Sequence, residues 1–216
     1  MDTRQRANAH IQRTTPGVGQ PRWTAASRTT AMWLRDLAGI WALLYAIYRG
    51  YYALGGTAGM FGEPVSWSDW RLINGIAALL LLGAAALPVA TARLWQRPRA
   101  RVVLLAIGWV IAVGCVMHGL VDIATRLLSI AGVIQMDLPF FVAGSVDRRM
   151  ADAQDLFFNE PWFLIEGVLW GAMCWVELTA GRARRWWLAS ALAAIVALTV
   201  IGVLSSAGVI GKFIIG

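Results

Sequence analysis

Three ionisable side chains recur at every fourth position in a part of the sequence that is otherwise apolar. The stretch MHGLVDIATRLL, residues 117–128, contains His118, Asp122 and Arg126. Residues four apart share one face of an α-helix, so these side chains form a polar stripe. A charged side chain in hydrocarbon costs about 2.5–3.5 kcal/mol on insertion scales, so we expect the stripe to face other helices and to serve a function. A histidine beside a carboxylate is suited to proton transfer.

Glu166 is a second candidate for proton chemistry. It lies between the apolar segments WFLI and GVLW, with no cation within a turn on its own helix. Such an acid must meet a partner on another helix or keep its proton. We expect Glu166 and Asp122 to lie at nearly one depth. One of them would be the general acid, and the other acid and His118 would tune and recharge it.

Two more polar residues are predicted at that depth, on two further helices. Arg49 comes shortly before the glycines that end the first apolar stretch, and Asn74 comes about one turn into the second. We expect them to hold the constellation together or to orient the polar head group of a substrate. Alternatively, the Arg49 side chain extends outward to the membrane surface.

Aromatic side chains accompany these polar residues. Tyr45 and Tyr52 lie on the first helix near Arg49, and Trp162 and Trp170 lie four residues to either side of Glu166. Because ring faces attract positive charge, these side chains are predicted to line a binding site and to stabilise a developing cation. The alternative is that the rings simply fill the core of a helix bundle.

These residues must be positioned by membrane helices. Of the 216 residues, 58% are apolar and 14% are charged, and the mean hydropathy is +0.60. A soluble domain rarely has so few charges, and about 20 apolar helical residues cross the hydrocarbon core. The expected fold class is therefore an all-α integral membrane bundle of five transmembrane helices. The stretches that predict them are residues 36–54, 70–92, 102–128, 161–180 and 187–213.

Arginines cluster in every second connection between these helices, and this pattern predicts the orientation of the helices in the membrane. The segments 1–30, 93–101 and 182–185 are basic, whereas most charges of the other connections are acidic. The positive-inside rule places the N-terminus in the cytoplasm and the C-terminus outside. We expect a disordered basic tail over residues 1–30 and a transmembrane domain over residues 31–216 of a multi-pass cell-membrane protein. The net charge of +7 then reflects topology and anionic lipid rather than nucleic-acid binding.

The outer connection 129–160 is long for so small a protein. It contains LPFFVAG at residues 138–144, an apolar piece too short to span a bilayer. We predict either a lid over the outer mouth of the bundle or a plain surface connector.

Two resemblances bear on function. The phrases YRGYYALGGTAG (48–59) and EPWFLIEGVLWG (160–171) are similar to those of small multi-span membrane proteins of actinobacteria, which brings no activity with it. In size, span count, membrane acids and aromatic content, the chain also resembles the small integral-membrane terpene cyclases of bacterial drimentine-type pathways. That resemblance implies protonation of the terminal alkene of a prenyl chain, as on a farnesylated indole diketopiperazine.

The sequence therefore predicts a proton-initiated cyclase of a hydrophobic prenylated substrate within the lipid bilayer. Because there is no aspartate-rich diphosphate motif, we expect neither a metal ion nor another cofactor. The competing class is a non-enzymatic membrane protein, either a carrier of protons or small solutes or a partner subunit. A carrier should have polar positions at both ends of the bundle, whereas the inner halves of the second, third and fifth stretches are almost wholly Ala, Leu, Ile and Val.

Overall fold

Within the residues that the structure describes, the fold is all-helical apart from one pair of two-residue strands, as the sequence predicts. The computed structural model describes residues 25–135, 142–143 and 146–211. Residues 1–24, most of the predicted tail, lie outside this description, but helix already begins at Ala25, so the tail ends earlier than expected. The five long helices are α2 (Ala25–Ala53), α3 (Trp67–Ala90), α4 (Pro98–Ile130), α6 (Glu160–Glu177) and α7 (Gly181–Ser206).

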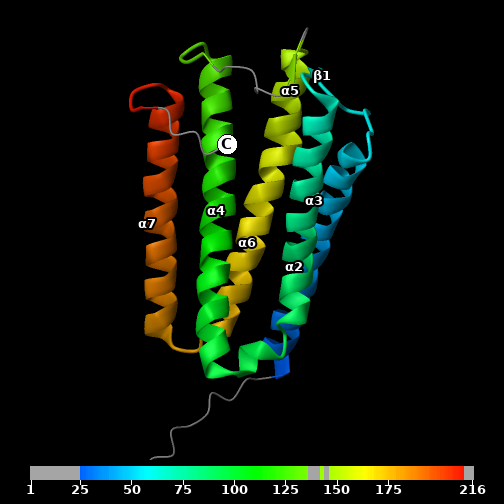
Figure 1. Ribbon diagram of the computed structural model, residues 1–216. Helices are drawn as coiled ribbons and strands as arrows, with labels where there is room; N and C mark the ends of the chain where they lie inside the picture. The colour runs from blue at the N-terminus through cyan, green and yellow to red at the C-terminus, as the bar shows by residue number, and fades with distance from the viewer. Residues whose placement is uncertain (1–24, 136–141, 144–145, 212–216) are drawn as a thin grey trace, which may run out of the picture.

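The long helices run alternately up and down, and each packs mainly on one or two others (Figure 1). Contacts join α3 to α2, α2 to α6, α6 to α4, and α4 to α7. The order in space therefore differs from the order in sequence, because α6 lies between α2 and α4. This arrangement places α6 against α2, which carries Arg49, and against α4, which carries His118, Asp122 and Arg126.

Glycines set the close approach of α4 to α6. A Cβ atom at Gly167 would lie 2.6 Å from Val116 Cγ2 and 2.9 Å from the carbonyl oxygen of Ala112. A Cβ at Gly119 would lie 3.0 Å from the carbonyl oxygen of Glu160. Small residues allow two helix backbones to approach closely in this way, which is a common device of membrane helices. The contact at Gly119 brings the first turn of α6 beside His118.

The predicted connection 129–160 is shorter than expected. Helix α4 continues to Ile130, and helix resumes at α5 (Arg148–Gln154), followed by a π-helical turn (Asp155–Asn159) that leads directly into α6. Proline in the first turn usually marks where a helix begins, so Pro161 suggested a start at that point. In the structure, helix precedes Pro161 because of the π-turn. The Glu160 N–H bonds to the Asp155 carbonyl, five residues back, and this wider turn continues into the proline.

Residues 136–141 and 144–145, which include most of the LPFFVAG segment, lie outside the described part of the chain. The strand β2 (Val142–Ala143) pairs antiparallel with β1 (Glu63–Pro64), with Glu63 opposite Ala143. This pairing joins the connection that follows α4 to the connection between α2 and α3, at the end of the molecule where β1 is labelled in Figure 1.

Three helices, α3, α4 and α7, are long and apolar enough to cross a membrane. In their most apolar windows only 17%, 22% and 11% of the residues are buried inside the protein, so most of these apolar side chains face outward. Helices α2 and α6 are not among these three, and they carry the charged residues Arg35, Asp36, Arg49, Glu160, Glu166 and Glu177 along their lengths.

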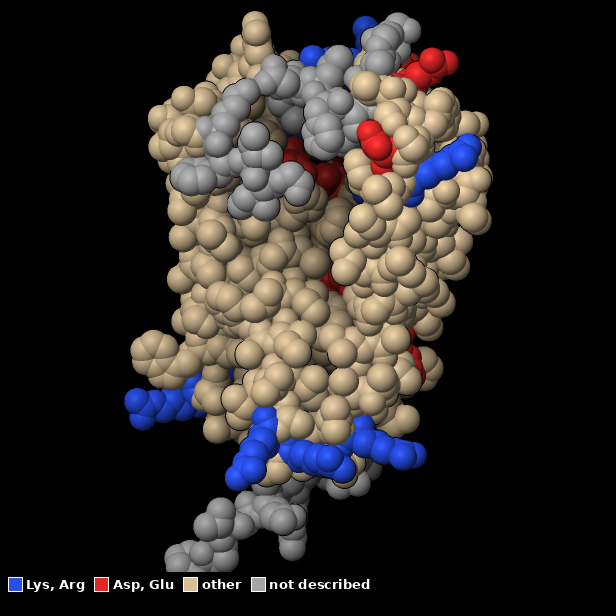
Figure 2. Space-filling view, in the orientation of Figure 1, with Lys and Arg blue, Asp and Glu red and all other residues tan. Residues whose placement is uncertain are grey.

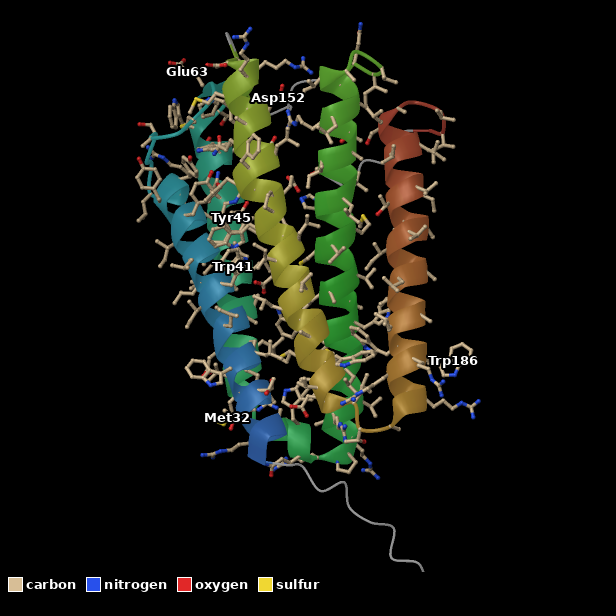
Figure 3. The ribbon with its side chains drawn as sticks, turned by 180° about the vertical axis from the view of Figure 1, so that it is seen from behind. Met32, Trp41, Tyr45, Glu63, Asp152 and Trp186 are labelled. Carbon is tan, nitrogen blue, oxygen red and sulfur yellow. The ribbon has the colours of Figure 1, made fainter. Side chains whose placement is uncertain are left out.

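The two ends of the molecule differ in charge: one end is basic, and the other, the acidic end, carries Asp and Glu together with some arginines (Figure 2). Basic side chains gather at the end where α3 connects to α4, and an apolar band separates them from the other end (Figure 2). Glu63 and Asp152 lie at the opposite end from Met32 and Trp186 (Figure 3). Figure 2 also shows a groove in this face, between the α3 side and the α4 side, with acidic side chains on its floor.

Candidate functional site

The predicted stripe on α4 meets an acid from α6. The Nε2 atom of His118 lies 3.4 Å from Oδ2 of Asp122, one turn along α4, and 3.8 Å from Oε2 of Glu160. The ligand atoms of the three residues all lie within 4.8 Å of one another. Glu160 is only 5% exposed, whereas the side chains of His118 and Asp122 are 47% and 41% exposed. One side of this cluster is therefore buried protein and the other is open.

One oxygen of Glu160 has an unusual environment. Its Oε2 atom is buried and accepts no hydrogen bond from the described part of the chain. The nearby His118 nitrogen, at 3.8 Å, is beyond hydrogen-bonding distance. A buried carboxylate oxygen that accepts no bond is costly, so this atom requires a proton or a cation.

Arg126, the last member of the stripe, is paired with two aspartates of the helix that leads into α6. Its Nη1 donates to Asp152 Oδ1 at 2.9 Å, and its Nη2 donates to Asp155 Oδ2. Asp155 also accepts a hydrogen bond of 2.8 Å from Asn159 Nδ2. All three charged side chains are less than one-fifth exposed. These bonds fix α5 and the π-turn against the end of α4.

Arg49 and Asn74 are in direct contact, as their common depth predicted. The Arg49 guanidinium donates to Asn74 Oδ1 at 3.1 Å and to the Tyr45 hydroxyl at 3.1 Å. Asn74 is fully buried, and its Nδ2 donates to the carbonyl of Trp70 at 2.9 Å. The Tyr45 hydroxyl in turn lies 3.3 Å from Asn159 Oδ1. Arg49 therefore points into the bundle and does not extend to the membrane surface.

A stack of aromatic rings lies between α2 and α6. The ring centroid of Trp162 is 4.2 Å from that of Trp41 and 5.4 Å from that of Tyr45, and both pairs are stacked. Arg49 lies over the Tyr45 ring, 5.2 Å from its centroid. Phe163 contacts both the Tyr45 ring and the His118 ring edge-on, at 5.6 Å and 4.5 Å. Tyr45 and Trp41 are labelled on α2 in Figure 3, on the side next to α6. The rings thus join the Arg49 cluster to His118.

Glu166 lies deeper in the bundle than this cluster. It is 6% exposed, and its Oε1 accepts a hydrogen bond of 2.7 Å from the Trp170 indole. Its second oxygen, Oε2, is buried and accepts no hydrogen bond from the described residues. Six residues separate Glu166 from Glu160, which corresponds to about 9 Å along the helix axis.

The structure thus brings together most of the predicted residues, in two groups rather than one. His118 and Asp122 form one group with Glu160, and Arg49, Asn74, Tyr45 and Trp162 form a second beside it. Glu166 and Trp170 form a separate pair below them. The Tyr52 hydroxyl lies outside these groups and donates to the Ala58 carbonyl at 3.0 Å in the α2–α3 connection.

Sequence reasoning missed Glu160 and its neighbours Asp152, Asp155 and Asn159. They were assigned to a loop that was taken to end at Pro161. The signal that could have found them is helical spacing across that proline: Asp152, Asp155 and Asn159 are three and four residues apart.

The chain matches no protein-family model, no curated protein and no solved structure. The class of protein that the fold defines is an all-helical protein with three helices able to span a membrane and a polar site among its helices. What it does must therefore be inferred from its own side chains.

Proposed function

We propose that this protein is a five-span membrane enzyme with a cytoplasmic N-terminus. In support, α2 and α6 also turn large apolar side chains outward, among them Leu37, Ile40, Ile47, Ile165 and Val168. Helix α2 has 29 residues, and the helical segment from Arg148 to Glu177 is longer than the about 20 residues that a bilayer requires. The arginine-rich end would then face the cytoplasm.

Its reaction, we infer, is the proton-initiated cyclisation of a prenyl chain. The observation that carries this proposal is Glu166, which is 6% exposed, has one oxygen that accepts no hydrogen bond from the described residues, and lies between two tryptophans of its own helix. Of the two acids that the sequence offered as proton donor, Asp122 has a side chain that is 41% exposed and faces His118. Glu166 is therefore the better donor, because a carboxyl group in an apolar site without a cation nearby retains its proton.

The chemistry is balanced without a cofactor. The Glu166 carboxyl gives its proton to the terminal alkene carbon, and the alkene electron pair forms the new C–H bond. The resulting tertiary cation is attacked by a second double bond, which closes a ring. The ring cation then loses a proton to a base, so the product is an isomer of the substrate and Glu166 is finally protonated again. A low-dielectric, water-poor site prevents capture of the cation by water.

The aromatic rings and the polar cluster have complementary tasks in this proposal. Helical positions four apart are rotated by about 40°, so Trp162, Glu166 and Trp170 follow a slowly turning line along α6. The ring faces of Trp162 and Trp170 would stabilise the positive charge as it moves from the terminal alkene to the newly formed ring. The Arg49–Asn74–Tyr45 cluster lies nearer the acidic end of the bundle, where it would hold the polar head group of the substrate.

The test is a deuterium-incorporation assay. Membranes that contain the protein are incubated in D2O with a farnesylated indole diketopiperazine, and the cyclised product is analysed by mass spectrometry. Wild-type protein should give a cyclic isomer that carries one added deuterium, and Glu166→Gln should reduce turnover at least a hundredfold, within the usual range for a lost general acid. Glu177→Gln is the matched control, because Glu177 is a buried glutamate of the same helix that pairs with Arg35 at the other end. Wild-type turnover by Glu166→Gln would refute the proposal.

One observation favours the alternative of a proton carrier. Helix α6 has three buried glutamates, Glu160, Glu166 and Glu177, at three depths. The last two are eleven residues apart, about 16 Å, and direct proton transfer requires a chain of hydrogen bonds over that distance. The test uses liposomes with a pH gradient and an enclosed pH-sensitive dye. If the protein is a proton carrier, the wild-type protein should dissipate the gradient faster than Glu166→Gln does. We expect no difference between the two proteins.

A further inference from the structure

The cluster of His118, Asp122 and Glu160 has the composition of a metal site. One imidazole nitrogen and two carboxylate oxygens lie close together, with all three ligand atoms within 4.8 Å of one another. Ligands at the 2.0–2.2 Å typical of zinc lie about 3.4 Å apart around a tetrahedral ion. The distances of 3.4 Å and 3.8 Å from His118 Nε2 to the two acids are close to that spacing. Small side-chain movements would therefore complete the geometry.

The buried oxygen of Glu160 points to a ligand independently of the cluster. Glu160 is 5% exposed, and its Oε2, the atom that faces His118, accepts no hydrogen bond from the described residues. Buried charges in proteins are paired or coordinate metals. A cation in the centre of the cluster would satisfy this oxygen.

The nearby arginines are already engaged. Arg126 is bonded to Asp152 and Asp155, and Arg49 is bonded to Asn74 and Tyr45. Neither guanidinium makes a direct ion pair with Asp122 or Glu160 among the described residues. The two acids are thus left facing one histidine, whose ring can contribute at most a single positive charge. Asp122 and Glu160 also hydrogen-bond to each other, which requires a shared proton, and a divalent ion would take the place of that proton.

We propose that His118, Asp122 and Glu160 bind one divalent transition-metal ion, with zinc as the first candidate. The ligands come from two helices, with His118 and Asp122 one turn apart on α4 and Glu160 at the start of α6. Three protein ligands leave a coordination position open, which is the arrangement of catalytic rather than structural zinc sites. The exposed halves of His118 and Asp122 are where an ion would enter and where a water molecule or a substrate oxygen would bind.

This inference goes beyond the cyclase proposal and does not depend on it. The proposed acid, Glu166, is not a member of the ligand cluster and lies about 9 Å further along α6. The expectation from the sequence was that no metal is bound, since no diphosphate motif is present. That reasoning concerned one kind of magnesium site and does not exclude a site built from His, Asp and Glu.

The experiment measures metal binding directly, in the absence of any substrate. Full-length protein in detergent is stripped with a chelator, titrated with Co²⁺, whose visible absorption reports coordination, and then challenged with Zn²⁺. We expect one equivalent of Co²⁺ per chain, displaced by Zn²⁺. The variants Glu160→Gln, Asp122→Asn and His118→Gln should each weaken binding at least tenfold. Elemental analysis of protein purified without a chelator gives a second measure of stoichiometry.

Two controls separate a built site from adventitious binding. Asp69→Asn removes an exposed acid outside the cluster, and Glu177→Gln removes a buried glutamate of the same helix. Both should bind Co²⁺ as wild type does. Zn²⁺ should raise the unfolding temperature of wild-type protein and of the controls, but not of Glu160→Gln, because a ligand stabilises only the state that binds it. Binding below one equivalent, or equal affinity in wild type and all three cluster variants, would overturn the proposal.

Discussion

Glu160 Oε2 and His118 Nε2 face each other at 3.8 Å across the interface between α4 and α6. The two residues are far apart in sequence, and the contact depends on the close approach of the helices at Gly119, where a Cβ would meet the Glu160 carbonyl at 3.0 Å. The cluster therefore forms only when the helical segment that begins at α5 is packed on α4. The packing of this pair of helices is accordingly the first property to test.

Removal of Arg126 should weaken this packing. In Arg126→Gln, Asp152 and Asp155 lose the guanidinium that both now contact, although they remain mostly buried. Breaking a buried ion pair by removing one partner costs about 3–5 kcal/mol, and we expect the lower end of that range for these partly exposed groups. Chemical unfolding in detergent measures the loss. The control is Arg149→Gln, which alters an exposed arginine of α5. Equal stability of the two variants would show that the Arg126 pairs contribute little.

A side chain at Gly167 should separate α4 from α6. The Cβ of Gly167→Ala would lie 2.6 Å from Val116 Cγ2 and 2.9 Å from the Ala112 carbonyl oxygen, a backbone atom that cannot move aside alone. Overpacking of this kind costs about 1–3 kcal/mol. Gly114→Ala, in the middle of α4, is the matched control, since a Cβ there meets nothing within 4 Å. It should be neutral or stabilising by up to about 1 kcal/mol through helix propensity. Comparison of the thermal unfolding of the two variants tests the close approach.

The positions of the long helices were predictable because their signal is simple. Apolar stretches of membrane-spanning length predicted all five, and the expected 70–92 and 102–128 compare with Trp67–Ala90 and Pro98–Ile130 in the structure. The common depth of Arg49 and Asn74 was expected, since both residues were counted from helix ends on the same side of the bundle, and in the structure the two side chains are in contact. Depth in a membrane helix follows directly from residue number.

The partner of Asp122 on α6 was not predictable by the same counting. Glu166 was expected at the depth of Asp122, but Glu160 lies there instead. The reason is that α4 extends to Ile130 and that helical structure already precedes Pro161, in α5 and the π-turn. Whether a helix stops or continues at a proline depends on the hydrogen bonds of the preceding turn, and here the Glu160 N–H bonds to the Asp155 carbonyl. Tertiary packing decides whether the helix continues at Pro161, and the pattern of apolar residues in the sequence contains no information on that packing.

The aromatic stack provides a graded test of cation stabilisation within the cyclase proposal. Trp162 stacks on both Trp41 and Tyr45, with centroid distances of 4.2 Å and 5.4 Å. Trp162→Phe keeps a ring with a weaker quadrupole, and Trp162→Leu keeps only apolar volume. If the ring stabilises a cation by about 1–2 kcal/mol, kcat should fall roughly tenfold or more in Trp162→Leu and less in Trp162→Phe, with KM little changed. A loss that appears only in KM would assign Trp162 to substrate binding alone.

The orientation in the membrane can be tested with single cysteines. Cys115 and Cys174 are free thiols inside the bundle and would be replaced by serine to give a background without reactive thiols. Glu63→Cys and Arg97→Cys then place one exposed thiol at each end of the molecule. Because the basic end should face the cytoplasm, a membrane-impermeant maleimide added to intact cells should label Glu63→Cys and not Arg97→Cys.

Permeabilised cells complete this test, since both variants should then react and the amount of folded protein can be compared. The result also decides where the site opens. His118, Asp122 and Glu160 lie nearer the acidic end of α4 than the arginine-rich end at Pro98. Labelling of Glu63→Cys alone would place the cluster in the outer half of the membrane, where a substrate or a metal ion reaches it from the extracytoplasmic side. Labelling of Arg97→Cys alone would reverse the topology and give the cluster access from the cytoplasm.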